Sequence, residues 1–478
     1  MPTCHYINSM PEHIAWGRLP CRDCEPVLRV ASGDTVVLDT ISHEGLIEDQ
    51  GRDPVAFFSR YGIQREDVLP EAIALAASDL PHSFDEDGPH ALIGPIHIEG
   101  ARPGDVLKVE IFALAPRVLY GVIANRHGRG TLPEEFPEGT LRRDGAAAEE
   151  PERYGSQFVC VPVEKSGQGW RGKIAAAGRE VTFPLNPFLG SMGVAPDDAE
   201  RWNSIPPTRV GGNIDINELG AGATLYLPVE VAGALFYAGD PHFAQGDGEV
   251  CLTALEGSLR ATVRLTVLPA GDERVPAVSG GTVRTPLAET ETHWITAGFH
   301  QDLDEALRMA VREAVAFLSG QFGIERRIAY AYLSAAADFE VSQAVDRNKG
   351  VHSLIRKADF RHFFSMHIAV GDQTLPATFL DGAAYVSARA VCNALRLPYD
   401  ETDEGVLAVT TPFGAIDMRI DSNKYVVNGI TVRLPVAPVA KKDETLLPVQ
   451  AVHKCLGIPV TWATEGGRIT GYPTLPNS

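Results

Sequence analysis

The segment at residues 236–250, FYAGDPHFAQGDGEV, brings together side chains that could carry out metal-assisted chemistry. It follows an almost wholly apolar run at 223–235. Its reactive groups are three carboxylates, one imidazole and one amide: Asp240, His242, Gln245, Asp247 and Glu249. Carboxylates and imidazoles suit zinc and other divalent ions, and a carboxylate outside the coordination shell can act as general base toward a metal-activated water. The segment therefore predicts a metal centre with a proton-transfer group.

The spacing within this segment indicates how the groups could meet. Side chains alternate along a strand, so Asp240 and His242 share a face if the preceding strand continues, and Asp247 and Glu249 do likewise. Three glycines let the backbone turn sharply enough for the two pairs to converge. A solvated polar loop is the alternative, because glycine, aspartate and glutamine are ordinary turn residues.

Further polar groups follow glycines in other strand-like segments. Asn213 and Asp215 lie in GGNIDINEL at 211–219, and His90 lies in GPHALIGPIHIEG at 88–100. An isolated histidine is more often a surface or core residue than a ligand. These segments support the predicted centre without identifying its ligands.

Composition restricts the class of protein. The chain has 478 residues and a net charge of −20, which disfavours binding to nucleic acid or to anionic membranes. Seven cysteines, an odd number, indicate reduced thiols, and the single CxxC at 21–24 lacks the second pair that a structural zinc site usually needs. No signal peptide and no long apolar run are visible, so we expect a cytoplasmic protein.

The periodicity predicts a β-rich domain followed by a smaller module. Residues 258–268 alternate strictly, as in a half-buried strand, whereas 302–318 repeat as an amphipathic helix, with Asp302 as N-cap and Gly320 as its end. A second helix is expected in 324–336. Two similar stretches, 385–399 and 446–460, form an internal repeat, each expected to be a strand end followed by a short helix.

The expected fold is mostly β with α+β elements. We assign residues 1–361 to a β-rich catalytic domain with a helical segment near 302–340. Residues 362–478 form a separate, small α+β module of ordinary domain size.

Several stretches resemble the acetamidase/formamidase family. The most specific is GALFYAGDPHFAQGDGEV at 233–250, and SIPPTRVGGNIDINEL at 204–219 agrees in order. The resemblance covers about residues 4–360, and the remainder is similar to the copper amine oxidase N-terminal-like (stalk) module, without implying copper chemistry. The chain departs from the family pattern at Pro241, where glycine is common, and at Val210, where histidine is common.

The resemblance implies hydrolysis of a short linear amide, of the formamide or acetamide type, to carboxylate and ammonia. It implies a divalent metal, with zinc as the expected ion, and a homo-oligomer of two or more subunits. Carried onto this chain, it implies metal ligands at Asp215, His242, Asp240 and His90. Catalytic groups are expected at Glu249, Asp247 and Gln245, and substrate-binding groups at Asn213 and Gly193.

Three alternatives stay open at this point. The same fold could open a cyclic amide, a lactam. Cys251 could act as a nucleophile, although buried cysteines are usually inert. The chain could also be a scaffold that has lost catalysis, which the retained carboxylates and imidazole argue against.

Overall fold

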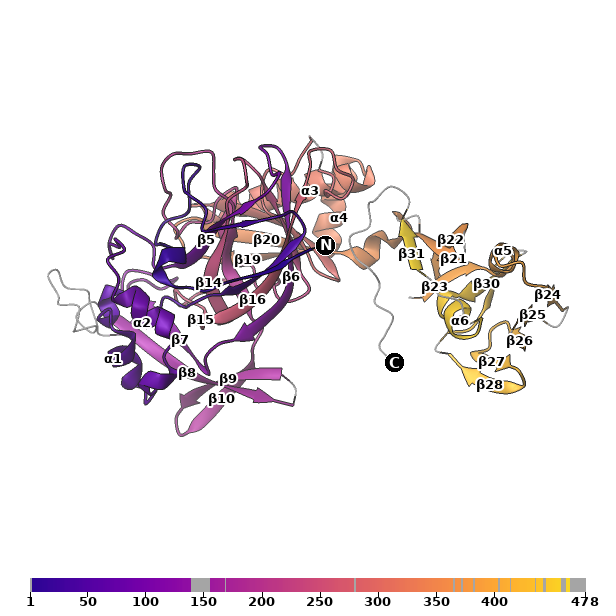
Figure 1. Ribbon diagram of the computed structural model, residues 1–478, viewed down its shortest axis with the longest axis horizontal. Helices are drawn as coiled ribbons and strands as arrows, with labels where there is room; N and C mark the ends of the chain where they lie inside the picture. Colours follow the sequence, from indigo (N-terminus) through magenta and orange to yellow (C-terminus); the bar gives the residue numbers. More distant parts are fainter. Residues whose placement is uncertain are drawn as a thin grey trace. The chain divides into compact units, whose positions relative to one another are not determined.

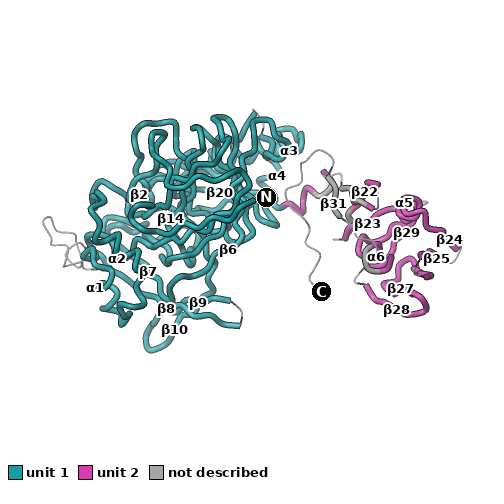
Figure 2. Tube along the Cα trace, in the orientation of Figure 1, with its two compact units in different colours: residues 1–356, 473–478 teal, residues 357–472 magenta. Residues whose placement is uncertain are grey.

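The computed structural model forms two compact units, residues 1–356 and 357–472, coloured separately in Figure 2. The structure describes residues 2–138, 155–167, 169–278, 281–363, 366–370, 373–380, 383–402, 405–412, 414–434, 436–441, 444–456 and 461–464. The expected assignment of domains at 1–361 and 362–478 stays a prediction, and each unit is treated by itself below.

A large mixed sheet forms one half of the first unit (Figure 1). Over the described residues it has nine strands: β1 (Cys4–Ile7), β4 (Asp34–Asp39), β16 (Leu259–Leu268), β6 (Val106–Pro116), β13 (Thr224–Pro228), β17 (Leu287–Glu289), β18 (His293–His300), β20 (Lys349–Arg356) and β19 (Asp338–Gln343). In β16 every second residue from Leu259 is buried, which confirms the predicted alternation.

A second sheet carries the predicted reactive segment. Its main path, within the described chain, is β10 (Arg179–Pro184), β9 (Gly169–Ala176), β8 (Ser156–Ser166), β7 (Tyr120–Arg126), β15 (Leu255–Glu256), β14 (Phe236–Ala244), β11 (Phe188–Gly193) and β12 (Gly211–Asn213). β5 (Ala91–Ile98) joins β14 from outside this path and itself pairs with β2 (Ile14–Trp16) and β3 (Leu28–Val30). β14 therefore pairs with three strands, which explains why eight of its nine residues are buried.

Four helices of the described first unit lie outside the sheets: α1 (Pro54–Ser59), α2 (Pro70–Ala76), α3 (Leu303–Phe322) and α4 (Arg326–Ala336). Asp302 caps α3 by accepting a hydrogen bond from the Glu305 amide, as predicted. The predicted end at Gly320 is wrong, because α3 continues to Phe322. Its C-cap is Gly323, whose backbone has the left-handed conformation.

α3 packs closely on β18 because Gly298 has no side chain. A Cβ at Gly298 would lie 2.2 Å from the Ala306 carbonyl oxygen, so the strand and helix backbones meet directly. In the part of the chain that the structure describes, no helix is both long and apolar enough to cross a bilayer.

The second unit contains two smaller sheets and two helices over its described residues. One sheet comprises β29 (Val439–Lys441), β30 (Glu444–Pro448), β23 (Ala383–Ser387), β22 (Gln373–Leu380), β21 (Met366–Val370) and β31 (Thr461–Thr464). The other comprises β24 (Tyr399–Glu401), β25 (Val406–Thr411), β26 (Gly414–Arg419), β27 (Lys424–Val427) and β28 (Ile430–Arg433). The helices are α5 (Ala388–Ala394) and α6 (Val449–Lys454).

The internal repeat corresponds to two equivalent strand–helix units. β23 leads into α5 and β30 leads into α6, as the sequence predicted. The two repeat strands are themselves antiparallel neighbours, with Val386 opposite Leu447. Residues 457–460 of the second copy lie outside the described residues. The unit therefore folds around its own apolar core, which includes Val391, Cys392 and Val452.

Candidate active site

β14 and its neighbours position the first reactive groups. Asp240 and His242 extend from β14 toward the same place, and His242 Nε2 lies 3.2 Å from Asp240 Oδ2. The register of β15 sets Glu256 beside His242, where its Oε1 lies 3.2 Å from the same nitrogen. The predicted common face of Asp240 and His242 is therefore present, with Glu256 added from the adjacent strand.

We call the surrounding group the central cluster. Its members are buried acids and imidazoles drawn from segments far apart in the sequence: His43, Asp215, Asp240, His242, Glu249, Glu256 and Asp346. They form four overlapping triads whose potential ligand atoms lie within 4.8 Å of one another. All seven side chains are at most 7% exposed. So many ionisable groups in so little solvent need mutual pairing, protons or a cation.

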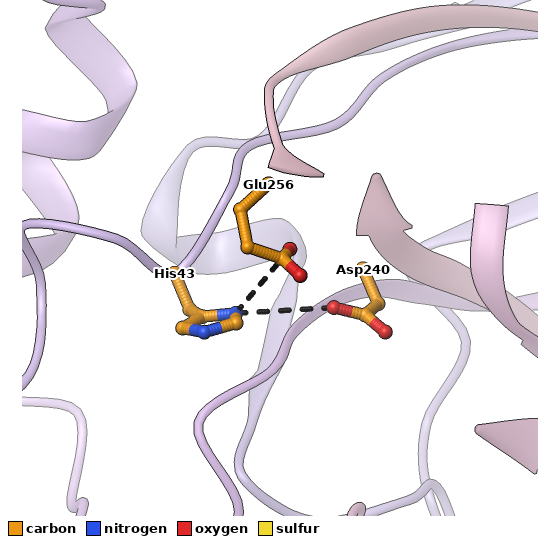
Figure 3. Close-up of side chains that lie close together, drawn as sticks. All are labelled: His43, Asp240 and Glu256. Carbon is orange, nitrogen blue, oxygen red and sulfur yellow. Dashed lines mark ion pairs between the residues drawn. The ribbon is translucent and has the colours of Figure 1, made fainter. Parts of the chain in front are cut away.

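His43 closes one side of the cluster. Figure 3 shows its ring directed toward Asp240 and Glu256, with Nδ1 at 3.8 Å from Asp240 Oδ1 and 3.9 Å from Glu256 Oε2. Its other nitrogen lies 3.2 Å from Glu44 Oε1. Neither ring nitrogen makes a hydrogen bond with acceptable geometry.

The centre of the cluster has the space and the free ligand atoms that a metal ion requires. A Cβ at Gly190, on β11, would lie 2.5 Å from both Asp215 Oδ1 and Asp240 Oδ2. Buried oxygens without hydrogen-bond partners face this region, among them both carboxylate oxygens of Asp215 and Oδ1 of Asp240. Buried polar atoms are rarely left unpaired, so this donor set fits a bound divalent ion.

Three carboxylates crowd the other side of the cluster. Asp215, Glu249 and Asp346 offer oxygens within 4.8 Å of one another. Burial and the neighbouring carboxylates raise the pKa of Asp215 and Glu249 well above their usual range, and burial raises that of Asp346 to about 7. These raised pKa values favour the protonated forms of the acids, and a bound cation would favour their deprotonation.

The pKa values of the two histidines His242 and His90 are shifted in opposite directions. Although burial alone would lower the pKa of His242, the carboxylates of Glu256 and Asp240 raise it well above the usual range. Burial lowers the pKa of His90 to about 4. His90 Nδ1 lies 2.8 Å from the Ser204 hydroxyl, and Nε2 lies 3.8 Å from Asp240 Oδ1. His90 is therefore a neutral imidazole at the edge of the cluster.

Asn213 links the cluster to neighbouring strands. Its amide nitrogen donates to Asp346 Oδ2 at 3.0 Å, and its amide oxygen accepts from the Ser191 hydroxyl at 2.8 Å. Both faces of the amide are thereby fixed. Asn213 also lines the cavity described below, and its expected role in substrate binding stays a prediction.

A cavity of about 410 Å³ opens onto the cluster. Its lining includes the buried Asp240, His242 and Glu249, together with Phe84, Ile205 and Arg347, which are more exposed. Arg126, also at the wall, is held by Asp49 through an ion pair of 2.6 Å. A cavity of this size, with a few polar groups that converge at one end, is typical of a small-molecule site.

Three of the predicted site residues lie away from the cavity. Asp247 is exposed, and its Oδ1 accepts a hydrogen bond from the Asn217 amide at 3.1 Å. The Gln245 amide donates to the carbonyls of Asp215 and Ser342, each at 3.0 Å, and so supports the backbone. Gly193 permits close packing, because a Cβ there would lie 2.4 Å from the Tyr237 hydroxyl.

Sequence reasoning missed His43, Glu256 and Asp346. His43 and Asp346 come from segments remote from 236–250, Glu256 lies six residues beyond it, and no periodic pattern connects them. The available signal was an acid in apolar surroundings: Glu256 lies in ALEGSL, directly before a strand, and Asp346 follows Ala-Val. Glu256 reaches His242 because β14 pairs with β15, the next strand along the chain, whereas His43 meets Glu256 from a distant segment.

The cysteines do not join this centre. Cys251 is absent from the described residues that line the cavity, and burial raises the pKa of its thiol. The Cys21 and Cys24 sulfurs lie 3.1 Å apart, and the Arg201 guanidinium donates to Cys24 Sγ at 3.3 Å. Among the residues the structure describes, this pair belongs to no group of three metal-ligating side chains.

Three cluster residues have left-handed backbone conformations. The φ angles are +48° at Asp215, +55° at Asp240 and +46° at Glu249. Such angles are uncommon outside glycine, and each is of the kind found where surrounding structure holds a functional side chain in place.

Comparisons with known proteins confirm the resemblance for both parts of the chain. Residues 76–204 and 197–356 match the sequence model of the Acetamidase/Formamidase family. Residues 370–470 match that of the Copper amine oxidase N-terminal domain.

Individual relatives agree with this family match. The Formamidase of Methylophilus methylotrophus is 31% identical over 191 residues, which cover 34% of this chain and 47% of that protein. The Acetamidase of Mycolicibacterium smegmatis is 29% identical over 201 residues, covering 34% and 49%. The chain thus spans about half the length of the curated relatives it matches. A crystal structure of an acetamidase from Bacillus halodurans is 27% identical with a TM-score of 0.55, covering 75% of this chain and 99% of that one.

Proposed function

Because the chain belongs to the acetamidase/formamidase family, we propose that it hydrolyses the C–N bond of a short linear amide to a carboxylate and ammonia. The observation that supports this proposal most directly is the convergence of buried carboxylates and imidazoles at the end of a cavity. Amide hydrolysis needs a nucleophilic water, stabilisation of the oxyanion and a proton for the departing nitrogen.

A divalent metal ion, for which zinc is our expectation, fits the central cluster. Asp215, Asp240 and His242 would hold it, since their ligand atoms converge beside Gly190. When bound, such an ion supplies Lewis acidity, which lowers the pKa of a water toward about 7 and polarises a carbonyl. Glu256 lies 3.2 Å from His242 and His43 lies between Asp240 and Glu256, so both side chains would help to fix the positions of the ligands.

Glu249 is our candidate for proton transfer. It lies at the cavity wall next to the ligand carboxylates, and burial and Asp346 raise its pKa. A carboxyl group with a raised pKa can accept a proton from the attacking water and return it to the leaving nitrogen. Ser191 and Asp346 fix the amide of Asn213, and its second N–H and its second oxygen lone pair would contact the substrate.

The test is ammonia release by the purified full chain from formamide, acetamide and a γ-lactam. We expect turnover of a linear amide, and a loss of about 10²–10⁴ in kcat for Glu249→Gln with metal content unchanged. Glu99→Gln, an exposed acid outside the cavity, is the matched control and should retain wild-type kcat. Unchanged turnover in Glu249→Gln would remove this residue from the mechanism. Absence of ammonia release from all three amides would contradict the proposed activity.

We also propose that the protein assembles as a homo-oligomer. Light scattering coupled to size-exclusion chromatography would give the mass of the assembly. A mass equal to the 51.5 kDa of one chain would contradict this part of the proposal.

A further inference from the structure

A second group of acids and a histidine lies outside the cavity lining. We call Glu218, Glu340 and His352 the flank cluster, since their ligand atoms also lie within 4.8 Å of one another. His352 Nε2 is 3.1 Å from Glu218 Oε2 and 3.7 Å from Glu340 Oε2. Glu218 follows Asp215 by three residues, Glu340 lies in β19 and His352 lies in β20.

The histidine is the feature that points to a ligand. His352 is 0% exposed, and its Nδ1 is fixed at 2.8 Å from the Ser342 hydroxyl. Its Nε2 has no hydrogen bond of acceptable geometry, and neither does Glu218 Oε2. This buried imidazole nitrogen is held only by ion-pair contacts at 3.1 and 3.7 Å, without a well-formed hydrogen bond, and folded proteins rarely leave a buried polar atom in that state.

A third carboxylate adds to the negative charge here. Burial and the charges of Glu218 and Glu340 raise the pKa of the nearby Asp247 carboxyl to about 6. It also accepts a hydrogen bond from the neutral amide of Asn217. Three carboxyl groups around one imidazole therefore leave an excess of negative charge, which a cation would neutralise.

We propose that Glu218, Glu340 and His352 bind a second divalent transition-metal ion, distinct from any ion held by the central cluster. A mixed set of carboxylates and one imidazole suits Zn²⁺ or Mn²⁺, whereas Ca²⁺ takes oxygen ligands alone. The site is structural, since none of its three ligands lines the cavity in the described chain.

The ion would stabilise the loop that carries Glu249. The Gly248 amide donates to the Ser342 carbonyl at 3.2 Å, and the Ala344 amide donates to the Gly248 carbonyl at 3.0 Å. The segment 247–249 is thus bonded to the end of β19, which itself supplies Glu340. Asp215 and Glu218 are similarly joined by a short stretch of backbone. An ion bound by the flank cluster would therefore restrain Glu249 and Asp215 of the central cluster.

Metal stoichiometry tests this proposal independently of amidase activity. The full chain is stripped with a chelator, reloaded with Zn²⁺ alone, dialysed and measured by plasma mass spectrometry. We expect the double variant Glu218→Gln/Glu340→Gln to hold one equivalent of zinc less than the wild type. Asp240→Asn/His242→Gln should lose zinc from the central cluster yet retain the flank equivalent. Equal zinc content in the wild type and the Glu218→Gln/Glu340→Gln variant would overturn the proposal.

Thermal unfolding provides the second readout. Zn²⁺ should raise the Tm of stripped Asp240→Asn/His242→Gln protein, because its flank cluster is intact and a ligand that binds only the folded state stabilises it. Zn²⁺ should not raise the Tm when Glu218→Gln/Glu340→Gln is added to that variant. The single variant Glu340→Gln, at a partly exposed position, serves if the combined variant fails to fold, and it should weaken the zinc-dependent shift. A zinc-dependent rise in Tm of equal size in Asp240→Asn/His242→Gln with and without Glu218→Gln/Glu340→Gln would contradict a flank site.

Discussion

The central cluster and the flank cluster are built from neighbouring segments yet have different surroundings. The central cluster has seven buried members and faces a cavity of about 410 Å³. The flank cluster has three, of which Glu218 and Glu340 are partly exposed at 20% and 34% of the side chain. One set of groups can therefore reach a substrate, and the other can reach only protein and solvent.

The difference shows that residue type does not determine the role of an acid. Asp247 and Glu249 are two positions apart on one loop, but Glu249 joins the central cluster and Asp247 adjoins the flank cluster. The left-handed conformation at Glu249 turns the chain between them. Access to the cavity, not proximity in sequence, separates a candidate catalytic group from a positioning one.

The largest effect is expected from filling the space at Gly190. Gly190→Ala sets a methyl group 2.5 Å from Asp215 and Asp240 oxygens, so we expect loss of zinc from the central cluster and a fall in kcat/KM of at least about 10². Gly246→Ala is the control, because its Cβ would meet no atom within 4 Å. Retention of zinc and activity in Gly190→Ala would show that the ligands converge elsewhere.

A smaller effect is expected at Glu256, which supports His242. Glu256→Gln removes a carboxylate 3.2 Å from His242 Nε2, and loss of such a partner typically weakens metal affinity by about 10–100-fold. Competition with a chromogenic chelator measures this change. Glu340→Gln should leave the affinity of the central cluster within about threefold of wild type, since it contacts none of the central ligands. Equal losses in the two variants would mean that the clusters act as one unit.

The pH dependence of the stripped protein follows from the raised pKa values in the central cluster. Asp346 has a pKa of about 7 against 3.8 when unfolded, and that of His242 is also raised. The folded state therefore holds more protons than the unfolded state, and the stabilisation is lost as pH rises through these values. His90, with a pKa of about 4, is already neutral. The loss runs from about pH 3.8 to about pH 7 for Asp346 and begins near pH 6.5 for His242, so the Tm of metal-free protein should fall as the pH rises from 6.5 through 7.

Metal-loaded protein provides the comparison for this measurement. Deprotonation strengthens metal binding, so its Tm should fall less over the same pH range. Calorimetry of both forms measures the difference. A Tm that rises with pH in the metal-free protein would contradict the assigned pKa directions.

The smallest effect is expected at Ser342, whose hydroxyl group contacts His352 of the flank cluster. Ser342→Ala removes the hydroxyl partner of His352 Nδ1, at a cost of about 1–3 kcal/mol in unfolding free energy if the nitrogen stays buried and unpaired. Denaturant unfolding measures this change. The kcat for amide hydrolysis should fall by less than about tenfold, because Gly248 and Gln245 bond to the Ser342 backbone, which the substitution retains.

The sequence was informative where one strand carries several reactive groups. Alternation predicted that Asp240 and His242 share a face, and the apolar run before them predicted burial; both are observed. Periodicity also predicted the alternating strand at β16 and the start of α3 at Asp302. These features depend on local spacing, which a sequence displays directly.

The rest of the site depends on contacts between distant segments. His43 meets Glu256 across more than two hundred positions, and no local pattern encodes that pairing. The role expected for Asp247 rested on uninterrupted alternation, whereas the chain turns between Asp247 and Glu249. In the second unit, likewise, the repeat was visible in sequence, but the pairing of its two strands was not.

The left-handed backbone at Asp215 and Asp240 limits which residue types can occupy these two positions. Among side chains other than glycine, asparagine and aspartate adopt this conformation most readily, whereas β-branched and bulky residues are strained in it. Asparagine is thus the one near-isosteric replacement that removes the charge without forcing the main chain to move. Directed libraries at these two positions should accordingly yield folded proteins rich in Asn and Gly, and a family member that has lost metal binding would be expected to carry the same residues.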